Sequence, residues 1–247
     1  MPQTPHRLLL ALWSAACLAG TASADFAADF DGLAAGEGPG GAWIVDGTVE
    51  AAAAGGGEAL RLRSEGNDSS ATARRPVEMV AGEEAWTASV DWCPGSWSKP
   101  GVVLELTQPN ANQRLFRITT LSGKNTFRAT DWPGGEETDT PIGEDYKKDH
   151  WYRVTATGTL GEPEYAVRIV ERGRENAADG EVVFDSAGGP KLRVNPSVRE
   201  PSLLGFGVWQ GQGPEGYEIL VDNVSFTSGS PAAADAGGDP EPPAEPE

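Results

Sequence analysis

The feature that most constrains this chain is a two-residue alternation of apolar and polar side chains, in short runs separated by Gly, Pro, Asn and Asp. Such runs predict β-strands, and no stretch between Asp25 and Thr227 has the spacing of an amphipathic helix. Without crossover helices, the strands predict an all-β fold of antiparallel sheets, packed as a two-sheet sandwich or jelly roll. The predicted strands are 42–50, 58–64, 70–78, 85–93, 102–108, 114–121, 125–131, 151–158, 164–171, 181–185, 203–210 and 217–226.

The two ends of the chain differ from this middle part. A basic start, an apolar stretch from Leu8 to Leu18 and small residues up to Ala24 predict a cleaved signal peptide over residues 1–24. The apolar stretch is shorter than the roughly 20 residues that a permanent membrane anchor needs. Lipid attachment at Cys17 is the alternative. Residues 228–247 hold only Ser, Gly, Pro, Ala, Asp and Glu, which predicts a disordered acidic tail.

We therefore expect one exported domain over residues 25–227, secreted or periplasmic. The whole chain carries a formal charge of −18, which disfavours binding to nucleic acid or anionic lipid. Nothing after Ala24 resembles a membrane span. Cys93 is the one cysteine after the predicted cleavage site, so no internal disulfide is expected. Beside Trp92, Cys93 is interpreted as a small buried apolar side chain.

The alternation also assigns the two faces of each strand. The residues predicted to face the core include Trp86, Ala88, Val90, Trp92, Val102, Leu104, Leu106, Phe116, Ile118, Phe127, Ala129, Leu204, Phe206 and Val208. The residues predicted to face outward include Asp91, Glu105, Arg117, Arg128, Trp132 and Trp209.

Three segments resemble the concanavalin A-like (laminin G-like) jelly-roll proteins of bacterial secretomes. They are Asp29-Phe30-Asp31-Gly32, His150-Trp151-Tyr152-Arg153-Val154 and the closing run from Tyr217 to Phe226. The resemblance implies that the first and last strands pair. It does not select a function, because that superfamily holds lectins, carbohydrate-binding modules, glycoside hydrolases, polysaccharide lyases and adhesion domains. The glucanase signature Glu-x-Asp-x-x-Glu fails here, since Ile142 stands where its third acid belongs.

The first functional hypothesis is a non-catalytic domain that recognises a carbohydrate. Exposed indole rings stack on sugars, and polar side chains beside them fix the hydroxyl groups. Trp132 and Trp209 are the predicted stacking residues, and Trp209 stands among glycines that clear space around its ring. Gln210, Arg117 and Arg128 are the predicted hydrogen-bonding partners.

Two alternatives stay open at this point. One is a glycan-cleaving hydrolase or lyase that uses Asp91 and Glu105 as acid and base, which requires the two carboxylates to face each other. The other is a structural or surface-assembly protein without a small ligand. His150, the one histidine after the predicted cleavage site, is interpreted as a residue at the end of a loop.

No organic cofactor is expected, and no cluster of zinc or haem ligands stands out in the sequence. If the terminal strands pair, however, Asp29, Asp31, Asp222 and Asn223 would converge. Their oxygen atoms are the ligands that calcium prefers. The sequence therefore makes them candidates for a structural calcium site.

Overall fold

The computed structural model describes residues 25–54, 57–66, 69–79, 85–95, 101–108, 113–121, 124–189, 191–209 and 216–229. The predicted signal peptide (1–24), Gln210 and the predicted tail from residue 230 onward lie outside the described residues.

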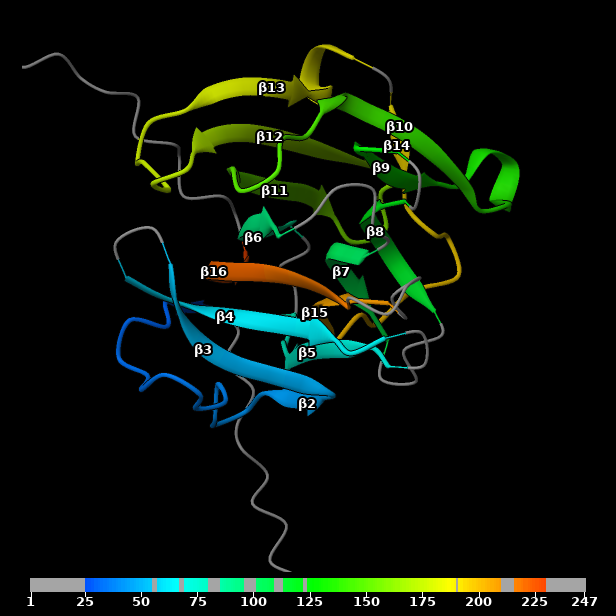
Figure 1. Ribbon diagram of the computed structural model, residues 1–247. Helices are drawn as coiled ribbons and strands as arrows, with labels where there is room; N and C mark the ends of the chain where they lie inside the picture. Colours follow the sequence, from blue (N-terminus) through cyan, green and yellow to red (C-terminus); the bar gives the residue numbers. More distant parts are fainter. Residues whose placement is uncertain are drawn as a thin grey trace, which may run out of the picture.

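Two antiparallel sheets pack face to face as a β-sandwich, which confirms the predicted all-β fold (Figure 1). The strands of sheet A, in spatial order, are β13 (Glu181–Asp185), β12 (Glu164–Gly173), β11 (Trp151–Thr159), β6 (Ala85–Pro94), β16 (Tyr217–Ser228), β4 (Gly57–Ser64) and β3 (Thr48–Ala54), with β14 (Leu192–Arg193) beside β12 and β1 (Phe26–Ala28) beside β16. Those of sheet B are β10 (Thr138–Asp145), β9 (Thr126–Asp131), β8 (Arg114–Thr120), β7 (Gly101–Thr107), β15 (Leu203–Val208), β5 (Ala71–Pro76) and β2 (Ile44–Asp46).

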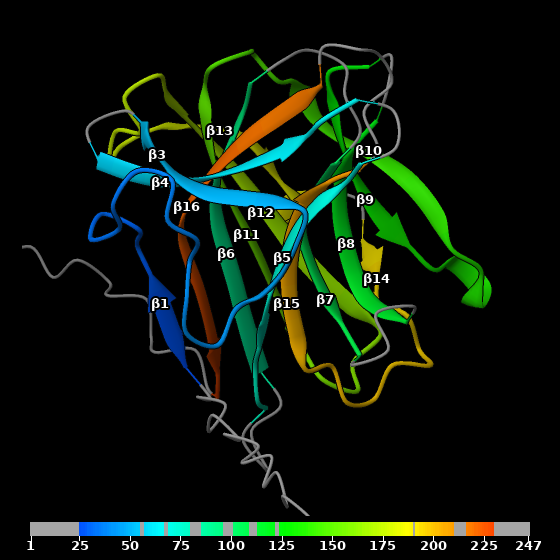
Figure 2. The same cartoon turned by 60° about the horizontal axis from the view of Figure 1, so that its bottom comes forward.

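The first and last strands of sheet A pair, as the resemblance implied. In Figure 2, β1 runs alongside β16, and Phe26 is registered with Phe226. The only helical elements among the described residues are two short 3-10 turns, η1 (Pro133–Gly135) and η2 (Ser186–Gly188). No helix in the described part of the chain has the length and apolar character that crossing a membrane requires.

Aromatic side chains from both sheets fill the space between them. Trp86 of β6 stacks on Phe116 of β8, with ring centroids 5.1 Å apart and planes inclined by 2°. Trp92 of β6 meets Phe127 of β9 edge-on at 5.4 Å. All four residues are buried, as the alternation predicted. Burial of each such side chain stabilises the fold by about 2–3 kcal/mol, so these contacts hold the sheets together.

The predicted inward position of Val102 is wrong. The pairing of β7 with β8 shifts by one residue between Val102 and Leu104. This β-bulge places Val103, rather than Val102, in the core, while Leu104 stays inside as predicted. From Leu104 onward the alternation therefore holds, and Glu105 faces outward.

The predicted strand 42–50 is two strands that belong to different sheets. β2 lies at the edge of sheet B and β3 at the edge of sheet A, with Gly47 between them. Gly47 has φ of +78°, and a Cβ atom there would lie 2.1 Å from the carbonyl oxygen of Ser70. Glycine is therefore required where the chain crosses from one sheet to the other.

Candidate functional site

A row of charged side chains crosses the outer face of sheet B. The strand register aligns Arg74 of β5 with Gly205 of β15, Gly205 with Glu105 of β7, and Glu105 with Arg117 of β8. Arg117 donates through Nε to Glu105 Oε2 at 2.9 Å, and Arg74 Nε lies 3.8 Å from Glu105 Oε1. Glu105 is only 4% exposed, because the two arginines cover it.

Gly205 makes this arrangement possible. A Cβ atom at this position would lie 3.0 Å from Arg74 Cγ and 3.5 Å from Glu105 Oε1. The missing side chain leaves the space through which Arg74 reaches across β15 toward the carboxylate. Gly205 is one of the glycines predicted to clear space around Trp209. Its missing side chain thus also makes room for the ion pairs of Glu105 with Arg74 and Arg117.

Two further arginines lie on the same face. Arg114, at the start of β8, lies 3.4 Å from Glu137 Oε1, and burial followed by the positive charge of Arg117 lowers its pKa. Arg128 of β9 is registered between Thr119 and Pro141. It makes no hydrogen bond or ion pair with any residue that the structure describes, and its Nε is buried.

Trp209 follows β15 on this outer face and is half-buried. The guanidinium carbon of Arg117 lies 5.5 Å from the centroid of its ring, a cation–π contact. We call this surface the arginine face. It consists of Arg74, Arg114, Arg117, Arg128, Glu105 and Trp209. The structure thus brings together three of the five predicted ligand-binding residues, while Gln210 lies outside the described residues.

Trp132 is not part of the arginine face, and its predicted exposure is wrong. It is only 5% exposed. It follows the Asp131 end of β9, whereas Val208 aligns through Gly101 and Thr120 with Phe127 at the other end. At about 3.3 Å per residue, the two tryptophans lie roughly 20 Å apart along the strands. One sugar ring therefore cannot stack on both.

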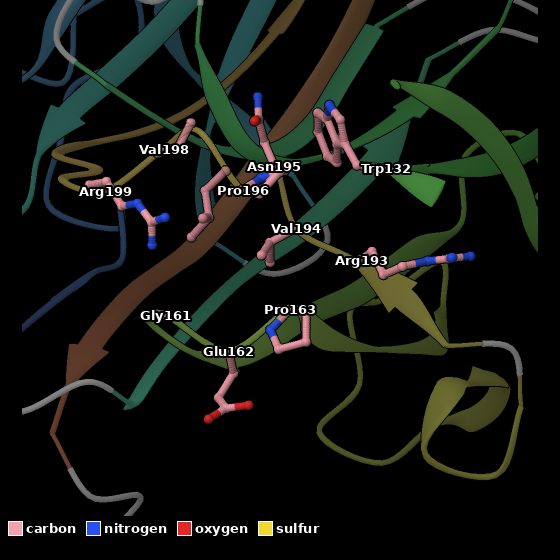
Figure 3. Close-up of a pocket in the computed structure, with 11 residues that line it drawn as sticks. Trp132, Gly161, Glu162, Pro163, Arg193, Val194, Asn195, Pro196, Val198 and Arg199 are labelled. Carbon is pink, nitrogen blue, oxygen red and sulfur yellow. The ribbon is translucent and has the colours of Figure 1, made fainter. Parts of the chain in front are cut away.

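Trp132 instead forms one wall of a cavity of about 190 Å³ at the end of the sandwich (Figure 3). The segment 193–199 covers the indole, which explains why alternation failed for a residue just beyond a strand end. The other lining residues are Leu115, Gly161, Glu162, Pro163, Arg193, Val194, Asn195, Pro196, Val198 and Arg199. The cavity is smaller than the roughly 300 Å³ at which ligand pockets ordinarily begin.

The outer face of sheet A carries a different cluster, centred on Asp91 of β6. Its carboxylate is fully buried and accepts from Arg172 Nη1 at 2.7 Å, Asn223 Nδ2 at 2.8 Å and Arg153 Nη2 at 2.9 Å. Asn176 Nδ2 donates to it at 3.2 Å. Burial alone would raise the pKa of Asp91, but the arginine and asparagine donors hold that pKa below its usual value.

The predicted pairing of Asp91 with Glu105 as acid and base is wrong in geometry. Asp91 lies on sheet A and Glu105 on sheet B, and both point away from the core. Packed sheets are themselves about 10 Å apart, so the carboxylates are separated by more than the roughly 5–9.5 Å that glycoside hydrolysis requires. Alternation places a residue on the outside of a strand but does not tell which sheet the strand joins.

The terminal strands pair and the charges of Asp29 and Asp31 act on Asp222, so these aspartates lie near one another, and calcium binding stays a prediction. No group of three or more His, Cys, Asp or Glu side chains in the described ranges is placed to hold a metal ion. Asp31 accepts from the backbone of Glu58 at 2.9 Å, and Asp222 accepts from the backbone of Asn223 at 2.7 Å. Burial, followed by the charges of neighbouring aspartates, raises the pKa of Asp222 to about 6.

His150 and Cys93, whose side chain types can be reactive, both make structural contacts. His150 precedes β11, and its Nδ1 lies 2.7 Å from Glu171 Oε1, in agreement with its interpretation as a loop-end residue. Cys93 is buried against Ala59 and Trp151, and burial raises the pKa of its thiol to about 12. The thiolate is the nucleophilic form, so Cys93 is unreactive at neutral pH.

The sequence matches no protein-family model, and it matches no curated protein sequence. Solved structures of similar fold include a carbohydrate esterase of the Shiga toxin-encoding bacteriophage phi24B, at 16% identity and a TM-score of 0.49 over 76% of this chain and 90% of that chain. Botulinum neurotoxin type C matches at 12% identity and a TM-score of 0.50, over 75% of this chain and 42% of that chain. The carbohydrate-binding module CBM66 from Bacillus subtilis matches at 14% identity and a TM-score of 0.47, over 76% and 96%. At 12% identity and a TM-score of 0.50, the neurotoxin match indicates a shared fold and nothing finer.

Proposed function

We propose that this chain is a non-catalytic, extracytoplasmic carbohydrate-recognition domain of the concanavalin A-like superfamily, and that glycan binds across the arginine face of sheet B. The observation that carries the proposal is the cation–π contact of Arg117 with Trp209, in which the guanidinium carbon lies 5.5 Å from the ring centroid. On the same face, the glycines of β15 carry no side chains. Botulinum neurotoxin type C, matched over 42% of its chain, interacts with two ganglioside molecules, which makes glycan a ligand class to test for this chain.

The chemistry of the arginine face suits a sugar. An indole ring packs against the apolar C–H face of a pyranose, and guanidinium groups donate several directed hydrogen bonds to its hydroxyl oxygens. Arg117 is held in place by Glu105, with 2.9 Å between donor and acceptor, and by its contact with the indole. A donor that is already ordered loses little conformational entropy when ligand binds.

Recognition without cleavage follows from the role of Glu105. Both of its carboxylate oxygens face arginines, and its expected partner Asp91 lies on the opposite side of the sandwich. In this arrangement Glu105 orients cations and is not positioned as half of an acid–base pair. The same carboxylate that suggested an enzyme in the sequence thus supports a binding surface in the structure.

Affinity electrophoresis of the purified protein through gels that contain single polysaccharides tests the proposal. We expect at least one polysaccharide to retard the native protein and the Trp209→Ala variant to lose about tenfold in affinity, because each lost stacking contact is worth about 1–1.5 kcal/mol. Arg199→Gln, at the rim of the Trp132 cavity, is the matched control and should bind like the native chain.

A folded Trp209→Ala protein that binds every polysaccharide as the native chain does would remove the arginine face from recognition. Loss of binding in Arg199→Gln alone would move the site to the Trp132 cavity. Absence of binding across a broad panel, with folded protein, would favour the structural or surface-assembly alternative.

A further inference from the structure

The arginine face is rich in cations on a strongly acidic protein. The chain has 37 acidic and 19 basic residues, yet four arginines lie on one outer face of sheet B, on strands β5, β8 and β9. Because the Debye length at physiological salt is about 8 Å, an approaching group responds to this local field rather than to the net charge of the whole molecule.

The carboxylates on this face do not neutralise it fully. Glu105 is shared between Arg117 and Arg74, and only the Arg117 contact, at 2.9 Å, is a hydrogen bond. Arg114 has a single long contact of 3.4 Å with Glu137. After burial, the positive charge of Arg117 lowers the pKa of Arg114, and the charges of Glu137, Glu105 and Asp139 act in the opposite direction.

Arg128 gives the strongest indication of a ligand on this face. It is half-buried on β9, and none of its five N–H groups has an acceptor in the part of the chain that the structure describes. The Nε atoms of Arg74 and Arg114 on the same face are likewise buried without an acceptor. Buried donors are nearly always satisfied, and a ligand bound on this face would supply acceptors for these three guanidinium groups.

We infer that the arginine face binds acidic rather than neutral glycans, with the carboxylate of a uronic acid placed against Arg128 while another sugar of the same glycan packs near Trp209. A planar guanidinium matches a carboxylate through two parallel hydrogen bonds, and such charge-assisted bonds are roughly twice as strong as neutral ones. The inference rests on the proposed function and specifies the class of glycan.

A matched pair of polymers tests the inference on the full chain. Polygalacturonate and its fully methyl-esterified form share one backbone and differ only in the charge of the carboxyl group. We expect the native protein to bind the acid about tenfold more tightly than the ester, as titrated by tryptophan fluorescence at physiological salt. Arg128→Gln should abolish this preference, and Arg128→Lys should keep part of it.

Arg168→Gln is the matched control, because Arg168 lies on β12 of sheet A and makes only an exposed contact of 3.8 Å with Asp185. It removes the same charge and should leave the preference unchanged. Circular dichroism and thermal unfolding verify that each variant is folded.

Equal binding of the acid and the ester would overturn the inference and leave the proposed function standing, whereas binding of neither polymer nor of any other polysaccharide would overturn both. An unchanged preference in folded Arg128→Gln would refute the role of Arg128. Polyglutamate bound as tightly as polygalacturonate would show attraction to charge alone, and tighter binding of dextran sulfate would reassign the recognised group from carboxylate to sulfate.

Discussion

At the scale of single residues, Asp91 shows how a charge on the outer surface of a strand becomes structural. It is fully buried, and two arginines and two asparagines donate to it. The cost of desolvating this carboxylate is offset only while its donors are in place, so removal of either side leaves a buried charge without a partner. The donors around Asp91 therefore give this carboxylate a structural role in the fold.

We expect Asp91→Asn to lower the free energy of unfolding by about 3 kcal/mol at pH 7, because it leaves Arg153 and Arg172 without their counterion. Urea unfolding measures the loss. Asp185→Asn removes an exposed partner of Arg168, at 3.8 Å, and should cost no more than about 0.5 kcal/mol. Equal losses of unfolding free energy in the two variants would contradict the proposal that Asp91 stabilises the fold.

The difference between native and Asp91→Asn protein should also depend on pH. Since the folded pKa of Asp91 lies below its usual value, its stabilisation is fully present above the unfolded pKa of about 3.9 and is lost as pH falls through the lower folded pKa. The gap in urea midpoints should therefore be constant from pH 6 to pH 8 and shrink below about pH 4.

The sequence predicted side-chain direction well wherever a strand continues without interruption. Trp209, Arg117, Arg128 and Glu105 all face outward, as the alternation indicated. Arg74 and Arg114 were missed, because nothing in their own strands marks them. Their significance comes from neighbours that are far away in the sequence, across Gly205 and at Glu137.

At the scale of elements, most predicted strands are found within one or two residues, and the differences lie at sheet edges. β10 is absent from the predicted strands because it contains Pro141, and proline lacks the N–H that a central strand donates. β10 is an edge strand, where that loss is tolerated. β1 and β14 are too short to show a repeating alternation.

Strand β15 allows a direct comparison of its two outward glycines. A Cβ atom at Gly207 would lie 2.7 Å from the carbonyl oxygen of Ala71, whereas the nearest atom to one at Gly205 is the flexible Arg74 Cγ, at 3.0 Å. We expect Gly207→Ala to destabilise the fold by about 1–3 kcal/mol, because backbone cannot yield as a side chain can. Gly205→Ala should cost less. Urea unfolding of both variants measures the difference, and the reverse order would contradict this view of β15.

At the scale of the whole molecule, the sequence could not predict which sheet each strand joins. Consecutive strands β6 and β7 belong to opposite sheets, which sends Asp91 and Glu105 to opposite faces. Local alternation cannot reveal such a crossing, because it reports only inside and outside. The sandwich was therefore predictable, while the composition of the arginine face required the three-dimensional arrangement.

The main proposal for the molecule as a whole is that glycan occupies the outer face of sheet B. Chemical-shift mapping of the isotope-labelled protein with tetragalacturonate and with cellotetraose tests this claim most directly. We predict that at least one of these probes shifts the indole N–H signal of Trp209 and the Nε–H signals of Arg117 and Arg128. The Nε–H signals of Arg153 and Arg172 should stay unchanged. Shifts confined to the Trp132 cavity or to sheet A, or no shifts with either probe, would contradict it.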